Sequence, residues 1–82
     1  MNADAGRSSF RITVKPAGIL KMYVREQEMD APAGCTSAAL IEKLGIPSKL
    51  RIFALVNGTK RPLDAQLEDG DEVRLVALLF GG

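Results

Sequence analysis

Residues 68–82, EDGDEVRLVALLFGG, decide the fold, and the rest of the chain is expected to pack around them. Asp69-Gly70-Asp71 predicts a turn, because glycine accepts positive φ and aspartate side chains bond to neighbouring backbone amides. Residues 73–80 are almost wholly β-branched or apolar, which favours a buried central strand over an exposed edge strand. The sequence then ends on Gly81-Gly82, where packing, capping or turn formation gives no reason for glycine.

Two terminal glycines predict a slender, flexible arm that presents an α-carboxylate without side chains. Such an arm can enter a narrow channel of another protein and bring its last carbonyl carbon close to catalytic groups there. The arm holds no base, nucleophile or metal ligand of its own, so the partner would supply them. The alternative interpretation is a frayed terminus of the kind that many domains have.

The composition argues against several classes of protein. The chain has 82 residues, 46% of them hydrophobic, which is enough for one small domain with a single core. The net charge is +1, and without a basic run or stacking aromatic residues no nucleic-acid partner is expected. With no histidine and one cysteine, the chain offers no imidazole base, zinc cluster or internal disulfide. An autonomous enzyme is therefore not expected.

Neither a membrane span nor a signal peptide is predicted. No apolar run approaches the roughly 18 residues that a span requires, and residues 1–9 lack the apolar centre of a signal peptide. We therefore expect a cytoplasmic protein with no membrane partner. Residues 1–9 are small and polar and are expected to be a disordered leader, with a single domain over residues 10–82 that ends in the flexible Gly-Gly tail.

Apolar residues occupy every second position of residues 10–15, which predicts a first strand with one buried face. Residues 16–18 predict its end, because proline lacks the N–H donor and glycine permits a reversal. Residues 19–24 fit either a strand or one face of a helix. We favour a hairpin whose second strand covers residues 25–31.

One helix is predicted after this hairpin. Thr36 is a suitable N-cap, and Gly45 followed by Pro47 forms a suitable C-terminal stop. The helical spacing places four residues on one face that must lie on a sheet: Ser37, Leu40, Ile41 and Leu44.

The last third of the chain completes the sheet. Residues 52–56 predict an apolar strand, Asn57-Gly58 a tight hairpin turn, and residues 60–63 a short return strand that Pro62 ends. A compact sheet with this element order places the last strand in the centre, parallel to the first, with the helix across one face. The expected fold is therefore α+β, a β-grasp or ubiquitin-like mixed sheet of four to five strands.

Four short segments in this order resemble the ThiS/MoaD family of sulfur-carrier proteins, which comprises the thiamine sulfur carrier and the small subunit of molybdopterin synthase. Together they span roughly residues 10–82, and the ordered set is more specific than any one of them. The segments are Gly34-Cys35-Thr36, Leu55-Val56-Asn57-Gly58, residues 67–73 and Gly81-Gly82.

The resemblance implies a carrier that other enzymes act upon. A ubiquitin-activating-type adenylyltransferase would bind the domain, and the carboxylate of Gly82 would attack the α-phosphate of Mg-ATP to form an acyl-adenylate. A desulfurase or rhodanese-like sulfur donor would then replace AMP and leave a thiocarboxylate for an acceptor synthase subunit. Gly82 is the implied site of activation, and Gly81 gives it access. The chain itself is expected to bind no cofactor and no metal, since Mg-ATP belongs to the partner.

A docking surface is expected on the sheet face away from the helix. If alternate residues of the two central strands fill the core, the others form an apolar patch on the opposite face. Such a patch is more often an interface than chance, although a covering loop or scattered surface residues would also explain it. The residues expected to bind the partner are Phe53, Leu55, Val76 and Leu78, with Phe80 before the glycines.

Cys35, the pathway and the class of function each have an alternative interpretation. Cys35 lies just before the helix N-terminus, where backbone amides and the helix dipole could stabilise its thiolate and allow it to hold sulfur. We expect instead that this cysteine packs as a small apolar residue. Residues 17–24 are longer than a thiamine-type carrier needs, which favours the molybdopterin branch. A ubiquitin-like modifier conjugated through Gly82 and a noncatalytic β-grasp interaction module are the alternative functions. The charged residues beside turns are given no role: Lys60, Arg61, Asp64, Glu68 and Asp69.

Overall fold

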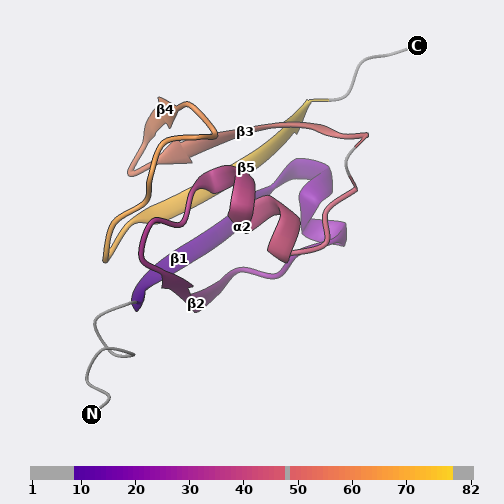
Figure 1. Cartoon of the computed structure of the whole chain (residues 1–82). Coiled ribbons are helices and arrows are strands. Elements are labelled where there is room, and N and C mark those ends of the chain that lie inside the picture. The colour runs from indigo at the N-terminus through magenta and orange to yellow at the C-terminus, as the bar shows by residue number, and fades with distance from the viewer. Residues whose placement is uncertain (1–8, 48, 79–82) are drawn as a thin grey trace.

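The structure, a computed structural model, describes residues 9–47 and 49–78 (Figure 1). Its strands are β1 (Ser9–Ala17), β2 (Gln27–Pro32), β3 (Arg51–Val56), β4 (Thr59–Arg61) and β5 (Glu72–Leu78). Its helices are the 3-10 helix η1 (Gly18–Met22) and the α-helix α2 (Ser37–Lys43). One five-stranded sheet in the order β2-β1-β5-β3-β4 packs against α2. The fold is α+β and of the β-grasp type, which confirms the predicted class.

The strand nearest the C-terminus lies in the centre of the sheet, as predicted (Figure 1). β5 pairs in parallel with β1 on one side and antiparallel with β3 on the other. Val73 and Leu75 are both 0% exposed, because strands flank β5 on both edges and its inner face meets the core. Two segments from opposite ends of the chain are thereby joined side by side.

β1 continues through Pro16, so the prediction that this proline ends the strand is wrong. Pro16 pairs with Leu75 of β5. Thr13 donates its backbone N–H to the carbonyl of Asp71, and N–H groups alternate between the two edges of a strand. An N–H at position 16 would therefore face the β2 side, where pairing has already ended at Val14. The proline removes no ladder hydrogen bond, which is the condition under which strands tolerate it.

Residues 19–24, which fit either a strand or a helix by sequence, include most of the 3-10 helix η1. Within η1, Leu20 is fully buried at 0% exposure while Met22 is 81% exposed, the pattern of a tight turn with one inward side chain. β2 accordingly begins at Gln27 instead of Arg25. β1 and β2 are nevertheless antiparallel neighbours, so the hairpin topology is confirmed with η1 in its connection.

The helix α2 forms as predicted. The hydroxyl of Thr36 accepts a hydrogen bond from the backbone N–H of Ala39 at 3.1 Å, which satisfies one of the free donors at the N-terminus. Gly45 adopts a φ of +74°, and its N–H bonds to the Glu42 carbonyl at 3.0 Å, as in glycine-terminated helices. In the described part of the chain, neither helix is long and apolar enough to cross a membrane.

The turn between β3 and β4 is also as predicted. Asn57 and Gly58 have φ values of +53° and +87°, which suits the two-residue type I′ turn that this dipeptide favours. β4 ends at Arg61, ahead of Pro62, and is shorter than the return strand expected over residues 60–63.

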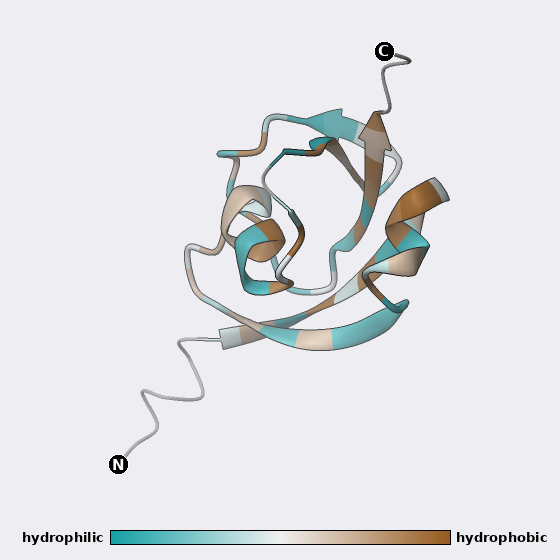
Figure 2. Ribbon diagram, turned by 90° about the vertical axis from the view of Figure 1, so that its right-hand side faces the viewer, coloured by the Kyte–Doolittle hydropathy of each residue, from teal (hydrophilic) through white to brown (hydrophobic). Residues whose placement is uncertain are grey.

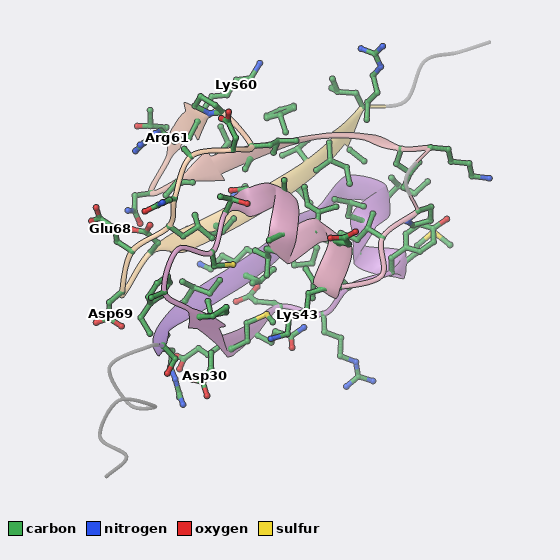
Figure 3. All side chains as sticks on the ribbon, viewed as in Figure 1. Asp30, Lys43, Lys60, Arg61, Glu68 and Asp69 are labelled. Carbon is green, nitrogen blue, oxygen red and sulfur yellow. The ribbon has the colours of Figure 1, made fainter. Side chains whose placement is uncertain are left out.

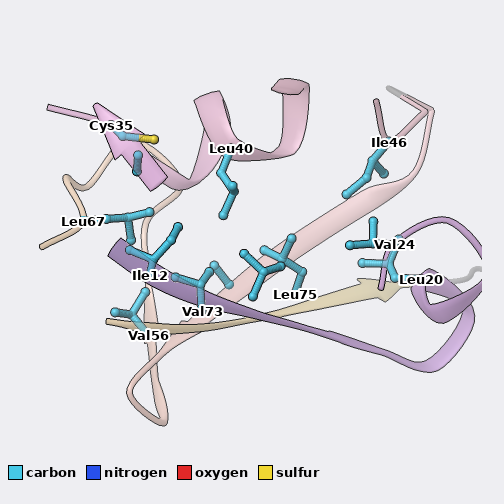
Figure 4. Close-up of a cluster of buried hydrophobic side chains, with 13 residues drawn as sticks. Ile12, Leu20, Val24, Cys35, Leu40, Ile46, Val56, Leu67, Val73 and Leu75 are labelled. Carbon is cyan, nitrogen blue, oxygen red and sulfur yellow. The ribbon is translucent and has the colours of Figure 1, made fainter. Parts of the chain in front are cut away.

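The hydrophobic core fills the space between the sheet, α2 and η1 (Figure 4). When the molecule is turned by 90°, the elements surround this core (Figure 2). Leu67, in the connection before β5, is 4% exposed and anchors that loop. The most deeply buried large apolar side chains are Ile12, Val14, Leu20, Leu40, Val73 and Leu75.

The two ends of the expected domain lie largely outside the described residues. Ser9 is the first residue of β1, so the leader expected over residues 1–9 reaches one residue into the sheet. Residues 1–8 and 79–82 are not among those described, and the disordered leader and the flexible tail stay predictions.

Candidate functional site

The root of the predicted reactive tail lies at the end of the central strand. Leu78 is the last residue of β5 and pairs with Arg51 of β3. Phe80, Gly81 and Gly82 follow it and lie outside the described residues, so their roles stay predictions. β5 pairs with β1 as far as Val76 and with β3 as far as Leu78, so the central strand ends beside β3.

The four described residues of the predicted docking surface share the sheet face away from α2. Ala54 and Leu75 are both 0% exposed in the core, and alternate side chains of a strand point to opposite faces. Phe53 pairs directly with Val76, which brings the two strands' outward residues together. We call this set the apolar patch: Phe53, Leu55, Val76 and Leu78. Their predicted placement is confirmed, and their role in binding stays a prediction.

The apolar patch is not evenly open to solvent. Phe53, Leu55 and Val76 are half-buried, whereas Leu78 is 43% exposed. The exposed end of the patch therefore coincides with the last described residue of β5.

A cation to which the sequence assigns no role borders this patch. The ammonium of Lys60 lies 5.1 Å from the centre of the Phe53 ring, within the range of a cation–π interaction. Lys60 points away from the domain (Figure 3). The sequence did contain a signal, because the two-residue turn at Asn57-Gly58 fixes the register that pairs Lys60 with Leu55.

Cys35 packs into the core and is 8% exposed (Figure 4). Its thiol donates to the carbonyl of Thr36 at 3.5 Å. Burial raises the pKa of the Cys35 thiol, and the positive charge of Lys43 opposes this to a smaller extent. The neutral thiol is therefore favoured over the thiolate, the form needed for sulfur chemistry, which agrees with the packing role that we expected.

Acidic residues near β5 are occupied in building its preceding turn. The carboxylate of Asp69 accepts the backbone N–H of Arg11 at 3.0 Å, and Asp71 accepts that of Glu68 at 2.8 Å. The Asp69 contact ties this turn to β1, and the Asp71 contact closes the turn itself. Among the described residues, no group of three histidine, cysteine, aspartate or glutamate side chains could hold a metal ion.

A pocket of about 290 Å³ lies beside η1 and shares no residue with the apolar patch. No motif of the sequence indicates this pocket. Its lining residues are Pro16, Lys21, Val24, Arg25 and Glu26, which supply neither a nucleophile nor a metal-binding set.

The sequence over residues 17–82 matches the model of the ThiS family. No curated protein matches the chain.

Solved structures from archaea resemble the fold. A protein from Pyrococcus furiosus described as molybdopterin converting factor, subunit 1, has a TM-score of 0.67 and 23% identity, covering 85% of this chain and 99% of that one. The Haloferax volcanii protein HVO 2177 has a TM-score of 0.74 and 16% identity, covering 92% and 89%. A Caldiarchaeum subterraneum ubiquitin has a TM-score of 0.62 and 20% identity, covering 90% and 99%. At these identities the likeness shows the fold alone.

Proposed function

This chain belongs to the ThiS family, and on that premise we propose that it is a sulfur carrier whose last glycine is activated and loaded by other enzymes. The observation that carries the proposal is the extent of the family match, which runs from the end of β1 to Gly82. The ubiquitin-like fold is consistent with a small protein that is handed between partners. Function nevertheless depends on the site and not on the fold, which hosts other roles.

The proposed chemistry takes place at the carboxylate of Gly82. One carboxylate oxygen attacks the α-phosphate of ATP on an adenylyltransferase, and pyrophosphate leaves. The acyl-adenylate turns an unreactive carboxylate into an electrophile, because AMP is a good leaving group. The terminal sulfur of a donor persulfide then displaces AMP, and a second thiol cleaves the resulting S–S bond. The products are a thiocarboxylate on Gly82 and an oxidised sulfur donor.

The partner supplies the groups that this chemistry requires. Mg-ATP is held by the adenylyltransferase, and we propose no nucleotide or metal site on this chain. Gly81 lets the tail pass into a narrow active site without side-chain clashes. An acceptor synthase subunit would afterwards take the sulfur from Gly82.

The apolar patch is the proposed docking surface for the adenylyltransferase, with Phe80 extending it toward the tail. Two features support this assignment. The patch gathers outward apolar side chains on adjacent strands, as interfaces do. Leu78 belongs to the patch and also ends β5, so a partner that binds the patch holds the root of the tail near its own active site.

We favour molybdopterin synthesis over thiamine synthesis as the pathway. The segment that suggested this choice, residues 17–24, contains η1, which lengthens the connection between β1 and β2. Complementation of bacterial strains that lack either carrier tests the choice directly. Growth restored only in the thiamine-requiring strain would reverse it.

The test of the proposed function is intact-protein mass spectrometry after incubation with an adenylyltransferase, Mg-ATP and a sulfur donor. We expect the exchange of one oxygen for sulfur on the full chain and no exchange on a variant that lacks Gly82. A covalent adduct between Gly82 and lysines of larger proteins would instead indicate a protein modifier. An unchanged mass in a system that loads another carrier would point to a noncatalytic interaction module.

A further inference from the structure

The register of the sheet places three cations in one row across the face that bears the apolar patch. Lys15 of β1 pairs with Arg74 of β5, Arg74 pairs with Leu55 of β3, and Leu55 pairs with Lys60 of β4. Lys15 and Arg74 point outward, because the residues that alternate with them on β1 and β5 are buried. Lys60 shares this face with its partner Leu55. We call Lys15, Arg74 and Lys60 the cationic row.

The cationic row borders the apolar patch directly. One step along the strands toward Leu78, the next outward row contains Ala17, Val76 and Phe53 in register. Leu55 itself stands between Arg74 and Lys60, so apolar and cationic side chains form one continuous surface. The tail root at Leu78 lies at the far end of that surface.

The charge of Arg74 does not stabilise the isolated domain. Lys15 stands directly opposite it on β1, and like charges at paired positions destabilise a sheet. The Lys15 ammonium lies 3.3 Å from a carboxylate oxygen of Glu72, whereas Arg74 forms no ion pair with any of the described residues. A charged residue at a position where it lowers the stability of the fold is typical of residues that serve a function.

Other carboxylates of this sheet face do not neutralise the row. Glu28 and Asp30 on β2 lie within 3.5 Å and 3.4 Å of the Arg11 guanidinium. Arg11 pairs with Asp30 toward the opposite end of β1 from Lys15. Of the row, Lys15 is paired with Glu72, so the charges left without a carboxylate partner among the described residues are those of Arg74 and Lys60.

We propose that the apolar patch and the cationic row form one docking surface for the activating adenylyltransferase, which meets it with an apolar surface edged by carboxylates beside Arg74 and Lys60. Complementary charge at an interface edge guides association and fixes orientation more than it adds affinity. The cationic row would therefore steer the enzyme onto the patch in the one direction that points the tail at its active site. This inference rests on the proposed function, because it names the chemistry of the partner that performs the activation.

The test compares two charge reversals with the same change in net charge. Arg74→Glu alters the cationic row, whereas Arg61→Glu alters β4 on the opposite face, since Arg61 pairs with the buried Ala54. The kcat/KM for adenylation, with the carrier as varied substrate, is measured by pyrophosphate release at low and high salt. We expect Arg74→Glu to lower kcat/KM roughly five- to tenfold at low salt, and Arg61→Glu to change it less than about twofold.

The salt dependence and a neutral variant separate docking from folding. The wild-type kcat/KM should fall with added salt, and that of Arg74→Glu should fall less steeply, because screening removes only an attraction that is present. Arg74→Gln should also lower kcat/KM while its melting temperature stays the same or rises, since the repulsion from Lys15 is lost.

Three results would overturn the inference. Equal kcat/KM values for Arg74→Glu and Arg61→Glu, with the wild type active, would exclude a role of the cationic row in docking. They would leave the proposed function intact. A wild-type dimer in analytical ultracentrifugation that Arg74→Glu dissociates would assign this face to a second copy of the chain. Failure of the wild type to be adenylated would overturn the proposed function and this inference together.

Discussion

The side-chain amide of Asn57 donates a hydrogen bond to the carboxylate of Asp71 at 2.9 Å. This contact joins the turn between β3 and β4 to the turn that precedes β5. The other end of the same amide accepts the backbone N–H of Glu72 at 2.9 Å, and Asp71 also receives the N–H of Glu68 at 2.8 Å. Two turns that are distant in the sequence therefore brace each other beside the start of the central strand.

Asp71→Ala should lower the free energy of unfolding by about 1–2 kcal/mol, because two donors lose their acceptor in a partly buried position. Chemical denaturation measures this change. Asp64→Ala serves as the control, since Asp64 is exposed and takes part in no hydrogen bond of the described residues. Equal stability of the two variants would show that the hydrogen bonds of Asp71 do not stabilise the domain.

Ser37→Ala should stabilise the domain by about 1 kcal/mol. Ser37 is 1% exposed, and its hydroxyl has no hydrogen-bond partner among the described residues, so its removal relieves a buried polar group and improves helix propensity. Thr36→Ala removes the N-cap and should act in the opposite direction by about 1 kcal/mol. Thermal unfolding of the pair gives the comparison, and a loss of stability in Ser37→Ala would mean that its hydroxyl does find a partner.

Cys35 should react with iodoacetamide more slowly than a free thiol at pH 8, because burial raises its pKa and limits access. The folded state then holds the thiol proton more tightly than the unfolded state. The associated stability is fully present below the pKa of the thiol in the unfolded state and is lost as the pH rises through its higher folded pKa. Alkylation followed by mass spectrometry at several pH values, with and without denaturant, checks this; equal rates in both conditions would contradict it.

Phe53→Asp should leave the domain folded and weaken binding to the adenylyltransferase by at least about tenfold, since it places a charge in the apolar patch. Met22→Asp is a matched control because Met22 is 81% exposed in η1, outside the patch. Circular dichroism tests the fold, and isothermal titration calorimetry measures the affinity. Unchanged affinity for Phe53→Asp would exclude the patch as the docking surface.

The sequence was sufficient where local chemistry decides the structure. Asn57-Gly58 needs positive φ at both positions, and the structure shows it at both. Thr36 caps α2 because its hydroxyl can reach a free N–H without any tertiary partner. The apolar run of β5 predicted its central position, since only a strand flanked on both edges buries so many such residues.

The sequence was insufficient where distant segments decide the structure. Pro16 is tolerated because β2 pairing has ended beside it, and Leu20 turns inward because η1 closes over the core near Leu75 (Figure 4). Neither fact is visible in the residues themselves. The apolar patch could be predicted from alternation within each strand, whereas the alignment of Arg74 with Lys15 required the parallel register of two remote strands.

The parallel pairing of β1 with β5 has a consequence for synthesis. The ribosome makes β1 before all the other elements of the sheet and its partner β5 after them, so the sheet cannot close until β5 has been made. Contacts between remote segments slow folding, and β1 keeps an unpaired edge while it waits. The sheet is therefore complete only when translation has passed Leu78, and a chain stalled before β5 lacks its central strand.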